Sequence, residues 1–120
     1  MPTVTKTKVA PVKTAPSKVE TMFQPFKING VQFRNRILAP PTVDDHADVD
    51  GKVTPTLIKH YRTLARQGVG TIIVESAYVT KQGRSHVNQL GISEEEHLEG
   101  LENLARGVKK EGASIGIRIS

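Results

Sequence analysis

The sequence predicts an α/β fold in which parallel strands alternate with helices. Two amphipathic helical patterns occupy residues 54–68 and 93–112, and three short apolar segments flank and separate them, at 36–39, 71–74 and 115–119. Repeated alternation of strand and helix implies parallel strands joined by helical crossovers. Two architectures fit this order of elements, a doubly wound sheet and a (β/α)8 barrel.

Residues 1–21 are predicted to be a disordered extension rich in Lys, Thr and Pro. Its prolines interrupt any helix, and its composition provides too little apolar surface to offset the entropy lost on ordering. It also lacks the apolar core of a secretory signal. The folded part of the chain is therefore expected to span residues 22–120 and to form one domain or less.

Composition and charge argue against several classes of function. Residues 1–19 carry four lysines and no acidic residue, so most of the net charge of +5 belongs to the extension and not to a nucleic-acid-binding face. The chain has no apolar run of about 18 residues for a membrane span, and no cysteine for disulfide or thiolate chemistry. We expect no nucleic-acid partner, no membrane partner and a cytoplasmic location.

A hairpin at residues 26–33 opens the folded part. Its two strands alternate in polarity around Asn29-Gly30, a dipeptide typical of a tight two-residue turn. The strand predicted at 36–39 follows the hairpin, and Pro40 ends it because proline cannot donate to a strand ladder.

Both predicted helices carry recognisable end signals. Thr54 is a candidate N-cap followed by Pro55 at the first helical position, and Gly68 ends this helix. Ser93 and Glu96 predict a capping box for the second helix. The apolar residues at helical spacing are Leu57, Ile58, Tyr61, Leu64 and Ala65 in the first helix and Leu98, Leu101, Leu104, Ala105 and Val108 in the second.

The chain is too short for a whole barrel. A (β/α)8 barrel typically takes about 250 residues, and this sequence predicts three of its strands and two of its helices. The strand at 71–74 is continuously apolar, which is typical of coverage on both faces, while so small a sheet leaves its edges unpaired. We therefore expect part of a larger fold, which self-associates or meets a second chain that completes it, for instance as a barrel.

Several polar patterns are better explained without a site. Gly68 and Gly70 are not a dinucleotide fingerprint, because the third Gly is absent and the pair precedes a strand, which leaves a nucleotide-binding doubly wound protein as a minor alternative. The acidic loop at 44–50 lacks the ligand positions of a calcium loop and is predicted to be solvated. His60 and His97 lie in predicted helices, away from the strand ends where barrels place their chemistry.

Short motifs follow one another along residues 22–120, namely FQPFKING at 23–30, NRILAPPT at 35–42, DGKVT at 50–54, VGTIIVE at 69–75, GR at 83–84, NQLGI at 88–92 and EH at 96–97. Their order and spacing resemble those of the N-terminal portion of the old yellow enzyme family of FMN-dependent NADH:flavin oxidoreductases. The resemblance favours the barrel over the doubly wound sheet. It implies an FMN-binding (β/α)8 TIM-barrel domain of which residues 22–120 are the N-terminal part.

The resemblance also implies cofactor-binding residues at the strand ends. Pro41, Thr42 and Val43 match the stretch that lines the flavin ring, and Ser76 matches a small residue that contacts it. Arg118 occupies the position where the family commonly has a Gln that bonds the pyrimidine edge. In the family, NAD(P)H reduces the flavin, and the flavin then passes a hydride to the β-carbon of a small-molecule activated alkene, with the protein supplying orientation and electrostatics.

The sequence departs from the family pattern at two positions, and several parts on which the family's activity depends come later in the barrel. Arg118 offers only donors, and Val43 replaces a Cys or Thr that tunes the flavin in many relatives. The family's substrate-holding His pair, its tyrosine proton donor and its phosphate-binding loops come later in the barrel, so no catalytic residue is assigned here. We expect weak or no FMN binding by this chain alone. The alternative hypothesis is a non-catalytic remnant that acts as an interaction or assembly module.

Overall fold

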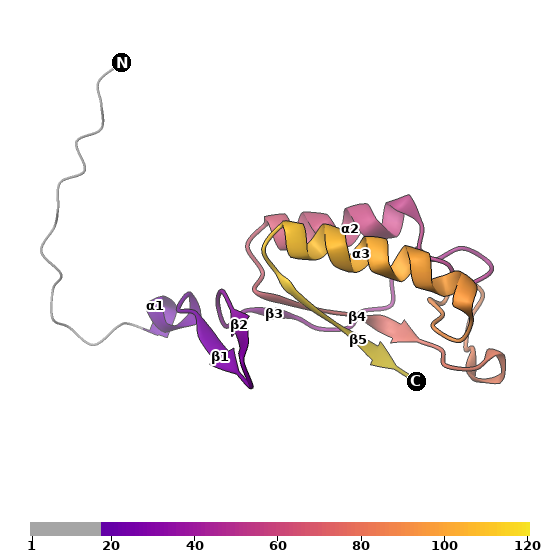
Figure 1. Ribbon diagram of the computed structural model, residues 1–120, viewed down its shortest axis with the longest axis horizontal. Helices are drawn as coiled ribbons and strands as arrows, with labels where there is room; N and C mark the ends of the chain where they lie inside the picture. Colours follow the sequence, from indigo (N-terminus) through magenta and orange to yellow (C-terminus); the bar gives the residue numbers. More distant parts are fainter. Residues whose placement is uncertain (1–17) are drawn as a thin grey trace, which may run out of the picture.

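The computed structural model describes residues 18–120, which form a small antiparallel hairpin and a three-stranded parallel sheet covered on one face by two helices (Figure 1). The elements are α1 (Lys18–Met22), β1 (Phe26–Ile28), β2 (Val31–Phe33), β3 (Leu38–Ala39), α2 (Pro55–Arg66), β4 (Thr71–Ala77), the 3-10 turns η1 (Lys81–Gly83) and η2 (Glu95–His97), α3 (Leu98–Lys110) and β5 (Ser114–Ile119).

The start of regular structure differs from the predicted boundary. Residues 1–17, most of the predicted extension, lie outside the described residues, so their disorder stays a prediction. Helix α1 occupies residues 18–22 and therefore includes the last part of the segment that was expected to be disordered.

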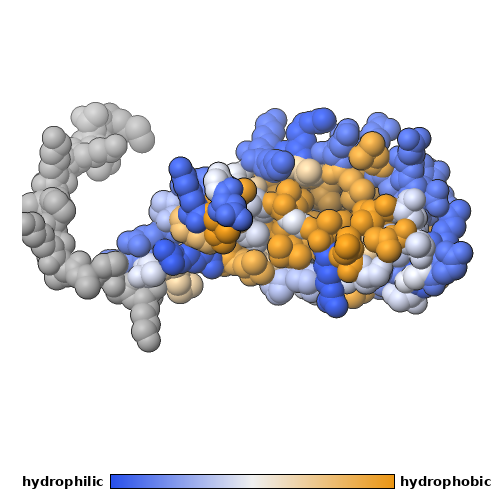
Figure 2. Space-filling model, turned by 60° about the horizontal axis from the view of Figure 1, so that its bottom comes forward, coloured by the Kyte–Doolittle hydropathy of each residue, from blue (hydrophilic) through white to orange (hydrophobic). Residues whose placement is uncertain are grey.

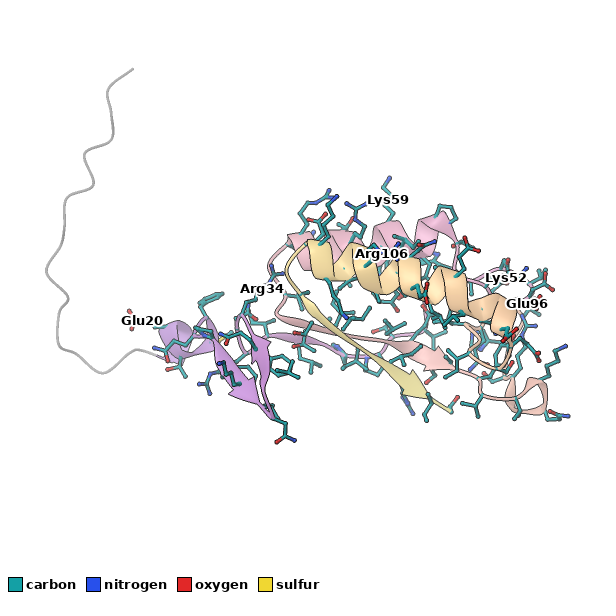
Figure 3. The ribbon with its side chains drawn as sticks, viewed as in Figure 1. Glu20, Arg34, Lys52, Lys59, Glu96 and Arg106 are labelled. Atoms are coloured by element: carbon teal, nitrogen blue, oxygen red, sulfur yellow. The ribbon has the colours of Figure 1, made fainter. Side chains whose placement is uncertain are left out.

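The predicted hairpin is confirmed. β1 and β2 pair antiparallel with Phe26 opposite Phe33, and these two rings stack with their centroids 4.9 Å apart. Asn29 and Gly30 both have positive φ, 46° and 81°, as a two-residue turn that matches the twist of its strands requires. Arg34, directly after the hairpin, reaches the turns that follow α2 and α3 (Figure 3).

Helix α2 begins and ends as predicted. The Thr54 hydroxyl accepts a hydrogen bond from the Leu57 N–H at 3.1 Å, Pro55 is the first helical residue, and Gly68 follows the helix with φ of 106°. A positive φ at that place is accessible to glycine at little cost.

The predicted start of α3 is wrong. Glu94, not Ser93, precedes the η2 turn, and its backbone N–H donates to His97 Nδ1 at 3.1 Å, while the buried Ser93 hydroxyl has no hydrogen-bond partner among residues 18–120. The His97 ring is held in place because its Nε2 also contacts the Asp50 carbonyl oxygen at 2.8 Å, so it takes the role predicted for Glu96. Leu98 is 57% exposed and does not belong to the buried face.

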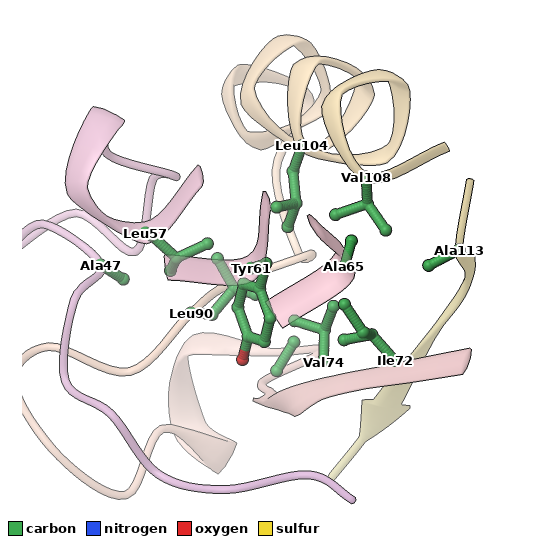
Figure 4. Packing of buried hydrophobic residues seen from close by; sticks show 11 residues of the cluster. Ala47, Leu57, Tyr61, Ala65, Ile72, Val74, Leu90, Leu104, Val108 and Ala113 are labelled. Atoms are coloured by element: carbon green, nitrogen blue, oxygen red, sulfur yellow. The ribbon is translucent and has the colours of Figure 1, made fainter. Parts of the chain in front are cut away.

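The parallel sheet has the order β3-β4-β5, as the strand–helix alternation predicts. β4 is longer than the predicted 71–74, and β3 is shorter than the predicted 36–39. The core lies between this sheet and the two helices (Figure 4). Its buried apolar residues are Ala47, Leu57, Tyr61, Ala65, Ile72, Val74, Ala77, Leu90, Leu104, Val108 and Ala113.

The helices leave the second face of the sheet uncovered within residues 18–120. With that face turned forward, apolar side chains gather over the strands (Figure 2). Leu38, which pairs with Thr71 on that face, is 52% exposed. None of the helices in the described part of the chain has the length and apolar character to cross a membrane.

Candidate functional site

The five predicted site residues come together at one end of the parallel sheet. Because β3, β4 and β5 run in the same direction, their carboxyl ends share one edge, the edge at which parallel α/β enzymes place their sites. The residues there are Pro41, Thr42 and Val43 just after β3, Ser76 near the end of β4, and Arg118 near the end of β5.

A bulge in β4 brings Ser76 opposite Arg118. Val74 pairs with Ile117 and Ala77 pairs with Ile119, so β4 uses one residue more than β5 between these pairs. Glu75 and Ser76 therefore both stand opposite Arg118 in the ladder. Bulges of this kind bend a strand, redirect a side chain and are common next to active sites.

The exposed groups at this edge differ in chemistry. Val43 is 62% exposed and offers an apolar surface. The Thr42 hydroxyl, also exposed, donates to the Pro40 carbonyl oxygen at 3.3 Å. Arg118 is exposed, and no hydrogen bond or ion pair holds its guanidinium within residues 18–120. The edge therefore combines apolar surface with available hydrogen-bond donors.

A buried carboxyl lies directly beneath this edge. Glu75 is 2% exposed, and the hydroxyl of Tyr61 in α2 donates to its Oε1 at 3.1 Å. Burial raises the pKa of the Glu75 carboxyl, the Tyr61 hydrogen bond opposes that rise, and the charge of Asp44 adds to it. Burial likewise raises the pKa of the Tyr61 phenol far above its ordinary range.

Two carboxylates of the acidic loop after β3 lie beside histidines of other elements. Asp44 Oδ2 lies 3.0 Å from His60 Nε2 of α2, and Asp45 Oδ1 lies 2.9 Å from His86 Nε2 in the loop after β4. The Asp44 side chain is only 20% exposed, so the prediction of a solvated loop is wrong for this residue, whereas the Asp45 side chain is 61% exposed, as a solvated loop requires. Among residues 18–120, no three or more His, Cys, Asp and Glu side chains form a group that could hold a metal ion.

Several residues of this region are not recognised from the sequence. Tyr61 is predicted only as part of an apolar helical face, and no local pattern pairs it with Glu75 fourteen positions later. The partners of His60 and His86 are equally remote in sequence. Asp44, His60 and Tyr61 also line a pocket of about 270 Å³ beside Thr42, together with Ala39, Pro40 and Leu64.

Comparison with known proteins identifies the family. The chain belongs to the NADH:flavin oxidoreductase / NADH oxidase family, whose model matches residues 21–120. It is 45% identical over 104 residues to an NADPH dehydrogenase of Geobacillus sp. (strain WCH70), an alignment that covers 85% of this chain and 31% of the relative. The chain therefore spans about a third of the length of that relative.

Solved structures support the barrel. One is a complex of 2-naphthoyl-CoA reductase with 2-naphthoyl-CoA, with a TM-score of 0.80 and 34% identity over 83% of this chain and 15% of that one. Another is an old yellow enzyme from Pichia sp. AKU4542, with a TM-score of 0.78 and 23% identity over 82% of this chain and 26% of that one. The predicted family and the predicted incomplete TIM barrel are thereby confirmed.

Proposed function

We propose that the edge formed by Pro41, Thr42, Val43, Ser76 and Arg118 is part of the floor on which the flavin ring of FMN rests. The observation that carries the proposal is the register of β4 and β5, which sets Ser76 opposite Arg118. Membership of the flavin oxidoreductase family supports FMN as the ligand.

The groups at this edge suit a flat heteroaromatic ring with a polar rim. The exposed Val43 side chain would pack against the apolar part of the ring, and the hydroxyls of Thr42 and Ser76 would face polar atoms at its edge. The Arg118 guanidinium has only donors, so it would donate to a flavin carbonyl and stabilise negative charge on the reduced ring.

The activity proposed for the complete protein follows from this site. When bound, FMN supplies the redox chemistry, which takes a hydride from NAD(P)H and gives one to an activated alkene. The residues of this chain bind and orient the ring, and the proton donor and substrate-holding residues belong to other parts of the barrel. A cytoplasmic location and a small alkene substrate are part of the same proposal.

Titration of the isotope-labelled chain with FMN and with riboflavin, followed by NMR, tests this proposal. We expect weak binding that shifts the amide signals of Thr42, Val43, Ser76 and Arg118 and leaves Gly30 in the hairpin unchanged. FMN and riboflavin should bind with similar affinity, since the phosphate anchor is expected elsewhere in the barrel. Shifts confined to other surfaces would contradict the site, and a tight one-to-one FMN complex would contradict the expected weakness.

The uncovered face of the sheet favours a second candidate, an assembly module without catalysis. Exposed Leu38 and half-buried Ile73, which alternate with the core-facing residues of their strands, are apolar groups of the kind that mark association surfaces. The partner would be a polypeptide that carries further strands of the barrel, or another copy of this chain. Sedimentation velocity over a wide concentration range tests self-association, and replacement of Leu38 by Glu should abolish any association seen.

A further inference from the structure

The bulge in β4 leaves backbone groups that side chains, not strands, satisfy. The Glu75 N–H donates to the hydroxyl oxygen of Tyr61 at 3.1 Å. The Ser76 carbonyl oxygen accepts from Nε2 of Gln89, also at 3.1 Å. A bulge disrupts the local ladder, and an unpaired buried backbone group destabilises the fold. Tyr61 and Gln89 therefore each stabilise one backbone group of the bulge.

Tyr61 reaches the bulge from α2, on the side of the sheet that the helices cover. It is 3% exposed in the middle of α2, and its ring belongs to the core. Its hydroxyl oxygen points away from α3 (Figure 4). The same hydroxyl accepts from the Glu75 N–H and donates to Glu75 Oε1, so both its roles are directed at one residue.

Gln89 holds the bulge from the loop after β4. It is 1% exposed, so its amide is an obligatory hydrogen-bonding group. Its Oε1 accepts from the Ser85 N–H at 2.7 Å and from the Ser85 hydroxyl at 3.1 Å, which orients its Nε2 toward the Ser76 carbonyl. The loop thereby braces the bulge independently of α2.

The bulge decides which face Ser76 occupies. Val74 and Ala77 both belong to the buried core although they are three positions apart. In a strand of strict alternation, residues two apart share a face, so Ser76 and not Ala77 would face the helices after Val74. The extra residue therefore places Ala77 in the core and frees Ser76 for the edge opposite Arg118.

We infer that Tyr61 and Gln89 are positioning residues, which lock the bulge at Glu75–Ser76 and thereby set Ser76 beside Arg118 in the flavin floor. The consequence for flavin binding rests on the function proposed above, whereas the stabilisation of the bulge by Tyr61 and Gln89 does not. Neither side chain is assigned a contact with the ring. Both act through the backbone of β4.

Amide hydrogen exchange in the complete chain tests whether Tyr61 stabilises the bulge. Tyr61→Phe keeps the ring and removes only the hydroxyl. We expect the Glu75 amide to exchange about fivefold to tenfold faster than in the wild type, relative to Ile72 and Val74. Tyr78→Phe is the matched control, because the Tyr78 hydroxyl donates to the Asp50 carbonyl oxygen and not to the bulge. A merely structural role for Tyr61 would accelerate all core amides by the same factor.

A second variant and the flavin titration separate the two proposals. Gln89→Met keeps the length of the side chain and should weaken the Ser76–Arg118 cross-strand NOEs even if Tyr61→Phe folds poorly. Tyr61→Phe should also reduce the riboflavin-induced shifts at Ser76 and Arg118, while Tyr78→Phe should keep them. Absence of those shifts in the wild type would contradict the flavin site alone. If the Glu75 amide exchange and the Ser76–Arg118 NOEs were unchanged in both variants, the positioning role of Tyr61 and Gln89 would be overturned.

Discussion

The guanidinium of Arg34 donates a hydrogen bond to the carbonyl oxygen of Glu111 at 2.8 Å, across 77 positions of the chain. The same guanidinium donates to the carbonyl oxygens of Ala65, at 2.5 Å, and Val69, at 2.7 Å. Helix C-termini present unpaired carbonyls and partial negative charge. Arg34 therefore joins the hairpin to the ends of both helices, at the end of the sheet opposite the candidate site.

Replacement of Arg34 by Met should lower the free energy of unfolding by about 2–4 kcal/mol, because the C-terminal carbonyls of both helices lose a charged donor. Urea denaturation near neutral pH measures this. Arg36→Met is the control, since Arg36 is exposed and lies over the Phe26 ring at 5.2 Å, a contact that contributes about 1 kcal/mol or less. Equal losses of unfolding free energy in the two variants would contradict the role of Arg34 in joining the hairpin to the helices.

Gly70 fits tightly against Asn35, so Gly70→Ala should lower the free energy of unfolding by about 1–3 kcal/mol. A Cβ there would clash with Asn35 Oδ1 and lie 2.8 Å from the Asn35 carbonyl oxygen, which is backbone and cannot easily move. At Gly83 an added Cβ would meet its nearest neighbour at 3.4 Å, an ordinary contact. Gly83→Ala should therefore leave the free energy of unfolding almost unchanged in the same urea experiment. A loss similar to that of Gly70→Ala would refute the explanation by a clash with Asn35.

Glu111 should make the chain sensitive to acid. Hydrogen bonds from Arg66 and Arg62 lower the pKa of the Glu111 carboxyl from 4.5 to about 2 in the folded chain. Folding therefore favours the ionised form, and this stabilisation is present above pH 4.5 and lost as the pH falls toward 2. Unfolding free energies measured between pH 2 and 6 should show a smaller acid loss in Glu111→Gln than in the wild type. Parallel pH profiles would contradict this prediction.

The contribution of Glu75 to stability should change with pH in the direction opposite to that of Glu111. Burial raises the pKa of its carboxyl above 4.5 in the folded chain, so folding favours the protonated form. The stabilisation from this proton is complete below pH 4.5 and is lost as the pH rises through the raised pKa. Glu75→Gln should therefore gain stability relative to the wild type as the pH increases from 4.5 to 8. A constant difference between the two proteins across that range would show that the pKa of Glu75 is not raised.

Arg118 should contribute to flavin affinity through its donors. Arg118→Ala should weaken riboflavin binding by about fivefold to tenfold, the worth of one lost hydrogen bond, while Arg118→Gln should retain part of the affinity because an amide can still donate. Arg106→Ala is the control, since Arg106 is exposed on α3 and its guanidinium bonds only Asn103 among the described residues. NMR titration gives the three affinities, and an undiminished affinity in Arg118→Ala would remove this residue from the site.

The sequence by itself determined the features that depend on neighbouring residues. Asn29-Gly30 specifies the turn of the hairpin because both positions take positive φ. Thr54 and Gly68 mark the ends of α2 because capping involves residues only a few positions away. The order of short motifs likewise predicted the family and the partial barrel, which the comparisons confirm.

Only the tertiary structure decided how the site is supported. The bulge that sets Ser76 opposite Arg118, the bond between Tyr61 and Glu75, and the replacement of the predicted Ser93–Glu96 capping box by Glu94 and His97 all depend on where separate elements pack. A periodic pattern shows which side chains are buried but not which buried groups meet. Polar partners remote in sequence are selected because a buried donor or acceptor must be satisfied in the assembled core.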